Sequence, residues 1–201
     1  MENGSQSAAA VSGRAVRAIV DGVVRTCGCF EDRTRSLLAR NGLADPSEDE
    51  WYAVADYRAV YDDLLATTGH NIVERIGVTL ARTVDWPADV DGVGDALAGL
   101  DGLHRSLHRG DAGGYEFTAT GPLAGRLRCS TPYPPAFERG VVRGIGQRFG
   151  ADSGFVAVRE ADRRDDDVTL SVRWWAERGS RESFEGSAAG TDGRTFTVAG
   201  D

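Results

Sequence analysis

Lysine is the residue that this sequence lacks altogether. All 23 basic side chains are arginine, and 31 aspartate and glutamate residues bring the formal net charge of the 201-residue chain to −8. Carboxylates in such excess repel one another less in concentrated salt, so the composition is typical of a halophilic protein; a high-GC codon bias produces the same exchange of lysine for arginine. Because anionic partners attract basic surfaces, the acidic balance argues against general binding to nucleic acid or to anionic membranes.

Long apolar runs are also missing. None approaches the roughly 20 residues that a membrane-spanning helix needs. The first residues, MENGSQSAAAVSGR, have no basic stretch followed by an apolar one, as a secretory signal would. We therefore expect a cytoplasmic protein. An apolar content of 41% still suffices for one globular domain of this length.

Cysteine is scarce, and its spacing does not form a metal site. Cys27 and Cys29 make a C-x-C pair, and Cys129 stands alone on a predicted strand. Zinc sites usually combine two such pairs, and no second pair is present. An odd number of cysteines without a secretory signal favours reduced thiols, so we expect free thiols and no metal.

The amino-terminal half has the periodicity of amphipathic helices. Apolar residues recur at spacings of three and four, which predicts helices over residues 11–24, 32–40, 57–69, 71–83 and 91–107. Asn41-Gly42 is a signal that ends the second helix. Ser47 and Glu50 have the spacing of a capping box that would begin the third, and Asp56 offers another start. These segments predict a helical lobe over residues 11–110.

After residue 110 the periodicity becomes alternating. We predict strands over residues 115–120, 124–130, 155–160 and 168–174. Pro134-Pro135 favours the start of a helix that runs to Gly150. The order ββαββ over residues 114–175 predicts an α+β fold, in which the helical lobe packs on a four-stranded antiparallel sheet. Residues 1–10 are expected to form a flexible leader and residues 176–201 a polar tail, with a possible edge strand at 195–198.

His104 is the first candidate functional residue. It follows Leu100 by four residues on its helix and lies at the edge of the buried stripe. His108 follows one turn later, and this spacing can place two imidazoles on one metal, but no third ligand and no H-E-x-x-H pattern accompany them. The alternative is a histidine at the edge of the core with hydrogen-bonded nitrogens, while His108 complements the helix dipole.

The order of these features resembles the end of a sensor domain of the heme nitric oxide/oxygen-binding (H-NOX) superfamily and of related 4-vinyl reductase-type ligand-binding domains. The resemblance rests on LDGLHRSLHRG, two strands and then PYPPAFERGVVRGIGQRFG, and it covers roughly the first 175 residues. It implies a single sensor domain over residues 11–175, in a divergent member with a haloarchaeal-looking composition. It also implies that His104 occupies the position of the proximal iron ligand, a role for which a neutral imidazole is suited.

The sequence departs from that family at the residues that hold heme. The family binds the heme propionates with a Tyr-x-Ser-x-Arg motif, and the corresponding positions here are Arg128, Ser130 and Pro132. Only the serine is retained. An arginine guanidinium binds a carboxylate through two parallel N–H donors, and proline has no side-chain donor to replace them. We therefore expect a heme-free relative with no cofactor; the alternative is a heme-binding gas sensor with His104 as its iron ligand.

The resemblance implies a stand-alone sensory module of signal transduction. We expect it to bind a small apolar ligand, or a tetrapyrrole, between the helical lobe and the sheet. The residues expected to contact the ligand are His104, His108, Arg128, Ser130, Tyr133 and Gly144. Gly140 and Gly144 share one face of their helix, which indicates close packing on the sheet or a wall of the ligand pocket.

The remaining functional predictions concern partners and chemistry. No nucleophile and base are paired in a catalytic motif, so we do not expect an enzyme. The signal would pass to a separate signalling protein or to a second copy of the chain, and neither nucleic acid nor membrane is expected as a partner. A structural or interaction protein, whose pocket is filled by its own side chains, is a further alternative.

Overall fold

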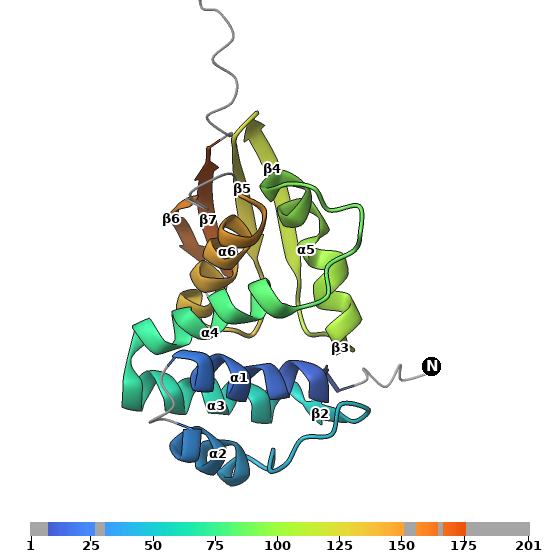
Figure 1. Cartoon of the computed structure of the whole chain (residues 1–201), viewed down its shortest axis with the longest axis vertical. Coiled ribbons are helices and arrows are strands. Elements are labelled where there is room, and N and C mark those ends of the chain that lie inside the picture. Colours follow the sequence, from blue (N-terminus) through green and yellow to red (C-terminus); the bar gives the residue numbers. More distant parts are fainter. Residues whose placement is uncertain (1–7, 27–30, 151–155, 165–166, 176–201) are drawn as a thin grey trace, which may run out of the picture.

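A computed structural model describes residues 8–26, 31–150, 156–164 and 167–175, which form an α+β fold (Figure 1). The helices in this part of the chain are α1 (Gly13–Thr26), α2 (Glu31–Arg40), α3 (Val54–Thr68), α4 (His70–Thr83), α5 (Val93–Leu107) and α6 (Pro135–Phe149). The strands are β1 (Ala10–Ser12), β2 (Trp51–Ala53), β3 (His108–Arg109), β4 (Tyr115–Gly121), β5 (Ala124–Cys129), β6 (Val156–Arg164) and β7 (Asp167–Trp174). The predicted fold class and the order ββαββ are confirmed.

The helical lobe buries the apolar stripes that the sequence predicts. In α3 the buried face consists of Tyr57, Val60, Tyr61 and Leu64, at spacings of three and four. Helices α1, α2, α3 and α4 form the lower part of the molecule, with the sheet above them (Figure 1). None of the described helices is long and apolar enough to cross a membrane.

The amino-terminal lobe also contains a small sheet, which the sequence analysis missed. Strand β1 lies between β2 and β3 and pairs antiparallel with both. Val11 was therefore wrongly predicted as helical, and the capping box of Ser47 and Glu50 is also wrong. Helix α3 begins only after β2, behind Ala53 and without a side-chain cap. Pairing between segments that are distant in sequence outweighs the local signals here.

The larger sheet has the strand order β4-β5-β7-β6, with every neighbouring pair antiparallel. Helices α5 and α6 lie on the same face of it in Figure 1. On β5, Leu127 and Cys129 point inward and are buried, whereas Arg126 and Arg128 are exposed. This alternation follows from the pleat and gives the sheet one apolar and one charged face.

Helix α6 packs closely on α4 rather than only on the sheet. A Cβ atom added to Gly144 would lie 2.5 Å from the carbonyl oxygen of Val78 and 2.8 Å from Cβ of Ala81, both on α4. Gly140 faces the carbonyl oxygen of Glu74, one turn away on the same helix. The expectation of close packing at these glycines is correct, but the neighbour is α4, because the two glycines lie on the side of α6 that faces the helical lobe.

Three sequence predictions concern residues outside the described part of the chain. These are the C-x-C pair of Cys27 and Cys29, the flexible leader over its first seven residues, and the polar tail with its edge strand at 195–198. Cys129 is described, and it is a buried free thiol. Burial raises the pKa of this thiol far above its usual value, so it remains protonated and unreactive.

Candidate functional site

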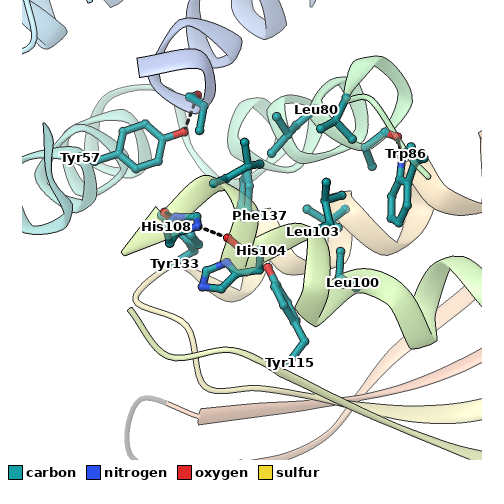
Figure 2. Close-up of a pocket in the computed structure, with 15 residues that line it drawn as sticks. Tyr57, Leu80, Trp86, Leu100, Leu103, His104, His108, Tyr115, Tyr133 and Phe137 are labelled. Carbon is teal, nitrogen blue, oxygen red and sulfur yellow. Dashed lines mark hydrogen bonds between the residues drawn. The ribbon is translucent and has the colours of Figure 1, made fainter. Parts of the chain in front are cut away.

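An apolar cavity lies where α1, α3 and α4 meet α5, α6 and β4, the first strand of the larger sheet. It is lined by Ala15, Tyr57, Leu80, Ala81, Val84, Trp86, Leu100, Leu103, His104, Leu107, His108, Tyr115, Tyr133, Phe137 and Val141 (Figure 2). Its free volume is about 40 Å³. A void of about 10–15 Å³ holds one water molecule, so this space admits a ligand of only a few heavy atoms.

A second depression of about 360 Å³ lies beside the cavity. The two share five apolar residues, which form the boundary between them: Ala15, Leu80, Val84, Leu103 and Leu107. The outer depression, which we call the vestibule, is rimmed by two ion pairs, Arg14 with Asp85 at 2.8 Å and Arg17 with Glu48 at 3.1 Å. The vestibule and the cavity are therefore separated by a wall that is one apolar side chain thick at these shared residues.

His104 lines the cavity from α5 and is only 5% exposed. Its Nε2 atom lies 3.2 Å from the carbonyl oxygen of Ala112, so Nε2 carries the proton and donates to that oxygen. Burial, and then the neighbouring His108, lower the pKa of His104 from its ordinary value to about 4. His104 is therefore neutral at physiological pH, as a core histidine or a metal ligand must be.

His108 and Tyr133 form the polar contact at the lobe side of the cavity. The His108 ring stacks on His104 with centroids 3.9 Å apart, and its Nδ1 atom lies 2.8 Å from the carbonyl oxygen of His104. A carbonyl only accepts, so Nδ1–H donates to it and Nε2 is left as an acceptor. The hydroxyl of Tyr133 donates to that Nε2 atom. Both residues of this pair were predicted as site residues.

An aromatic cluster occupies the space beside this pair. The rings of Tyr57, Tyr61, Tyr133 and Phe137 meet edge to face or tilted, with centroids 5.1–5.6 Å apart. Such arrangements add favourable contacts beyond the burial of area. The hydroxyl of Tyr57 donates to the carbonyl oxygen of Ala15 at 2.9 Å, which ties α3 to α1. Four aromatic rings of the chain therefore pack together beside the cavity.

Glu138 is a buried carboxyl group that the sequence analysis did not single out. It lies in the first turn of α6, is 1% exposed and accepts hydrogen bonds from Tyr115, at 2.8 Å, and from Thr131. Burial raises its pKa to about 7, while the two hydroxyl donors act in the opposite direction. The sequence does contain a signal that Glu138 is buried, because it lies at helical spacing from Val141 and Ile145, on the same buried stripe of α6.

The other predicted site residues lie away from the cavity. Arg128 is on the solvent face of β5, paired with Asp167 at 2.6 Å. Ser130 is exposed, and its hydroxyl donates to the carbonyl oxygen of Gly114 at 3.2 Å. Gly144 contacts α4 and does not line the cavity. The structure thus brings together His104, His108 and Tyr133, and it separates them from the remaining three.

The residues present do not fit a heme in this arrangement. The Nε2 atom of His104 donates to a carbonyl oxygen and cannot bind iron at the same time. The cavity of about 40 Å³ is far below the roughly 300–1,000 Å³ of sites for larger organic ligands. Arg128 faces solvent, and Pro132 lines a separate surface depression with Arg58 and Asp62. Within the described residues, no group of three histidine, cysteine or acidic side chains is placed to hold a metal ion.

Comparison with solved structures places this architecture among H-NOX folds. The chain is similar to an H-NOX protein from S. oneidensis in its Fe(II)NO state, with a TM-score of 0.61, 15% sequence identity, and coverage of 82% of this chain and 99% of the other. It is also similar to an oxygen-binding H-NOX domain related to soluble guanylate cyclases, with a TM-score of 0.60, 14% identity, and coverage of 88% and 100%.

A third similar structure is a mutant H-NOX of T. tengcongensis, with a TM-score of 0.62, 14% identity, and coverage of 81% of this chain and 97% of the other. No protein-family model and no curated protein matches the sequence. The chain therefore has an H-NOX-like fold, as the resemblance at the sequence level implies, with sequence identities of only 14–15% to these structures.

Proposed function

We propose that this chain is a ligand-binding sensory module of signal transduction, which binds a small apolar ligand in the cavity between helical lobe and sheet. The observation that carries the proposal is the cavity itself. Its walls are almost entirely apolar and aromatic, and it shares five apolar lining residues with the vestibule. Such a site suits a small uncharged molecule, which the Nδ1 atom of His104 and the hydroxyl oxygen of Tyr133 could orient by accepting hydrogen bonds.

The proposal includes the absence of a cofactor. Three observations support it: the Nε2 atom of His104 is engaged with Ala112, the cavity is small, and Arg128 and Pro132 stand where the family has its propionate-binding tyrosine and arginine. Losing two such hydrogen bonds, at roughly 1–3 kcal/mol each, lowers affinity by several orders of magnitude.

The proposal treats the chain as a cytoplasmic sensor and not as an enzyme. Its proposed partner is a separate signalling protein or a second copy of the chain, to which ligand binding passes a change of shape. The cavity supports this idea because it touches α1, α3, α4, α5, α6 and β4 at once. A ligand that fills it would alter how the lobe sits against the sheet.

A heme-binding gas sensor is the second candidate. It is favoured by the neutral state of His104 and by similar structures that are described as NO-bound or oxygen-binding H-NOX proteins. In that case His104 would hold the iron after its ring turned away from Ala112, and the aromatic cluster would have to open.

The absorption spectrum of the protein, purified from a heme-sufficient host, separates these candidates. We expect no Soret band at stoichiometric occupancy. A full band that disappears in His104→Ala, with the fold retained by circular dichroism, would establish the gas sensor instead.

Xenon tests the apolar cavity directly, because it binds in dry apolar voids. We expect xenon to shift the methyl NMR signals of Leu80 and Leu103, and Leu103→Phe, which fills the cavity, to abolish the shift. Leu123→Phe, at an exposed turn, is the matched control and should leave the shift intact. Unshifted methyl signals in the wild type would indicate a structural protein with a filled pocket.

A further inference from the structure

The outer face of the larger sheet has no helix on it among the described elements. The covered face carries Leu127, Leu170 and Val172, all fully buried, and α6 contacts the strands β6 and β7. The side chains that alternate with them point the other way, and most are exposed. In Figure 1 both α5 and α6 lie in front of the sheet.

Three arginines gather on this outer face, on three neighbouring strands. Arg126 of β5 and Arg159 of β6 lie opposite the same residue of β7, Ser171, one from each side. Arg173 follows Ser171 by two residues on β7, so it lies on the same face and diagonal to both. Diagonal neighbours in a sheet are about 7–8 Å apart, which is within the reach of guanidinium groups. We call these three residues the arginine cluster.

No acidic side chain neutralises the arginine cluster within the described part of the chain. Among the residues that the structure describes, none of the three guanidinium groups takes part in a hydrogen bond or an ion pair. The acidic residues of this face lie nearer its other end, where Arg128 pairs with Glu116 and Asp167. Like charges on neighbouring strands of one face repel one another, and an anionic group bound between them would reduce this repulsion. In a chain of net charge −8 such a local excess of positive charge is the reverse of the general pattern.

Two exposed large apolar residues lie at the same end of the sheet. Trp175, 50% exposed, follows Arg173 by two residues, and Leu123, 38% exposed, is held beside it by a hydrogen bond of 3.1 Å from the amide of Trp174 to its carbonyl oxygen. Tryptophan and arginine are the residue types that dominate binding energy at protein interfaces. The combination of arginine and exposed apolar surface favours a protein partner over a free anion, which would need no apolar contact.

We propose that the outer face of the larger sheet, centred on the arginine cluster and extended by Leu123 and Trp175, is a docking surface for an acidic segment of a partner protein. Carboxylates of the partner bind the guanidinium forks, with the hydroxyl of Ser171 between two of them, and apolar side chains of the partner cover Leu123 and Trp175. The surface lies on the side of the sheet opposite the cavity. It goes beyond the proposed sensory function and does not depend on which ligand the cavity takes.

The test uses a fluorescein-labelled peptide in which pairs of glutamate alternate with single leucines, titrated with the full chain at about 50 mM salt, where surface charges are weakly screened. The test variant is Arg126→Ser/Arg159→Ser/Arg173→Ser. The matched control is Arg33→Ser/Arg58→Ser/Arg75→Ser, which removes the same charge from exposed positions on α2, α3 and α4. Circular dichroism melting checks that each variant is folded.

We expect the wild type and the control to bind the peptide equally and the cluster variant to bind at least about tenfold more weakly, a difference of about 1.4 kcal/mol. Equal affinity of the cluster variant and the wild type, or loss of binding in the control, would overturn the proposal. So would failure of the wild type to bind the peptide.

Two further arms identify a different occupant. Tighter binding of a fluorescein-labelled oligothymidylate than of the peptide would assign the surface to nucleic acid. A concentration-dependent increase of mass that only the cluster variant lacks would assign it to a second copy of the chain. Either result refutes the partner proposed here and leaves the test of the cavity with xenon unaffected.

Discussion

The hydroxyl of Tyr133 donates a hydrogen bond to Nε2 of His108, and this bond joins the loop before α6 to the end of α5. The direction of the bond is fixed by the other ring nitrogen, which donates to the carbonyl oxygen of His104. Tyr133 thus holds His108 in its neutral form. Burial also favours the neutral ring, because it lowers the pKa of His108 from its ordinary value.

The first prediction concerns that bond. Tyr133→Phe removes the donor to neutral His108, so we expect the pKa of His108 to rise toward its ordinary value and the free energy of unfolding to fall by about 1–3 kcal/mol. The chain has three histidines, and NMR titration of their ring protons follows the pKa directly. Tyr52→Phe, which removes an exposed hydroxyl bonded to Glu50, is the control and should change stability by less than about 1 kcal/mol. An unchanged pKa would show that Tyr133 has no influence on the ring.

The second prediction concerns the pH dependence of stability. The pKa of Glu138 is raised to about 7 in the folded state, so the folded chain keeps a proton that the unfolded chain releases above about 4.5. Stability from this group is therefore lost as pH rises from about 4.5 to about 7, by roughly 3 kcal/mol in total. Glutamine does not titrate, so Glu138→Gln does not lose this stability as pH rises. The melting temperature of the variant should therefore rise relative to that of the wild type between about pH 4.5 and 7.

The comparison with the wild type is necessary because His104 acts in the opposite direction. Its pKa is lowered to about 4, so its contribution to stability is lost as pH falls from about 6.5 to about 4. Both chains in the comparison contain His104, and its effect cancels. Asp89→Asn, at an exposed position between α4 and α5, controls for the loss of one negative charge. A difference between Glu138→Gln and the wild type that is constant with pH would show that Glu138 is ionised throughout.

The third prediction contrasts two helical glycines. Gly144→Ala should destabilise the fold by about 1–3 kcal/mol, because the added methyl group meets the backbone of α4. Gly102→Ala, on α5 with open space around the added atom, should stabilise it by about 1 kcal/mol through helix propensity. Thermal or urea unfolding of both variants measures the difference. A stabilised Gly144→Ala would contradict the close approach of α6 to α4.

The fourth prediction concerns salt. The chain has eight more acidic than basic residues, so screening of carboxylate repulsion should raise the melting temperature between about 0.1 M and 2 M KCl. Salt weakens both the stabilising ion pairs and the repulsion between carboxylates. Because acidic groups are in excess, we expect the loss of repulsion to be the larger effect, so that the melting temperature rises. A melting temperature that falls with salt would mean that the ion pairs dominate, and it would count against a halophilic protein.

Local periodicity was sufficient to predict most of the elements. The helical stripe of Tyr57, Val60 and Leu64 and the alternation of Leu127 with Arg128 are properties of neighbouring residues, and the structure retains both. The small sheet was missed for the opposite reason. Its strands have only two or three residues each, and their pairing joins Val11 to residues far along the chain, which no local pattern reveals.

The candidate site was predicted only in part, because some of its residues are neighbours on one helix and others come together only in the fold. His104 and His108 lie on one helix, so their common location follows from helical spacing. Tyr133 joins them through the fold of the loop before α6, which the family resemblance supplied. Arg128 was assigned to the site by alignment with a motif, but strand alternation directs it to the opposite face of the sheet. Glu138 was not predicted, because its two hydroxyl partners, Tyr115 and Thr131, are brought to it only by the fold.

The small sheet bears on how the chain folds during its synthesis. Strand β1 is the first described element, yet its second partner is His108–Arg109, so it stays incomplete until the ribosome has produced the whole helical lobe and α5. The end of α5, which carries His108, is locked when β3 joins β1. The position of His108 at the edge of the cavity is therefore set late in synthesis, only after β3 has been produced.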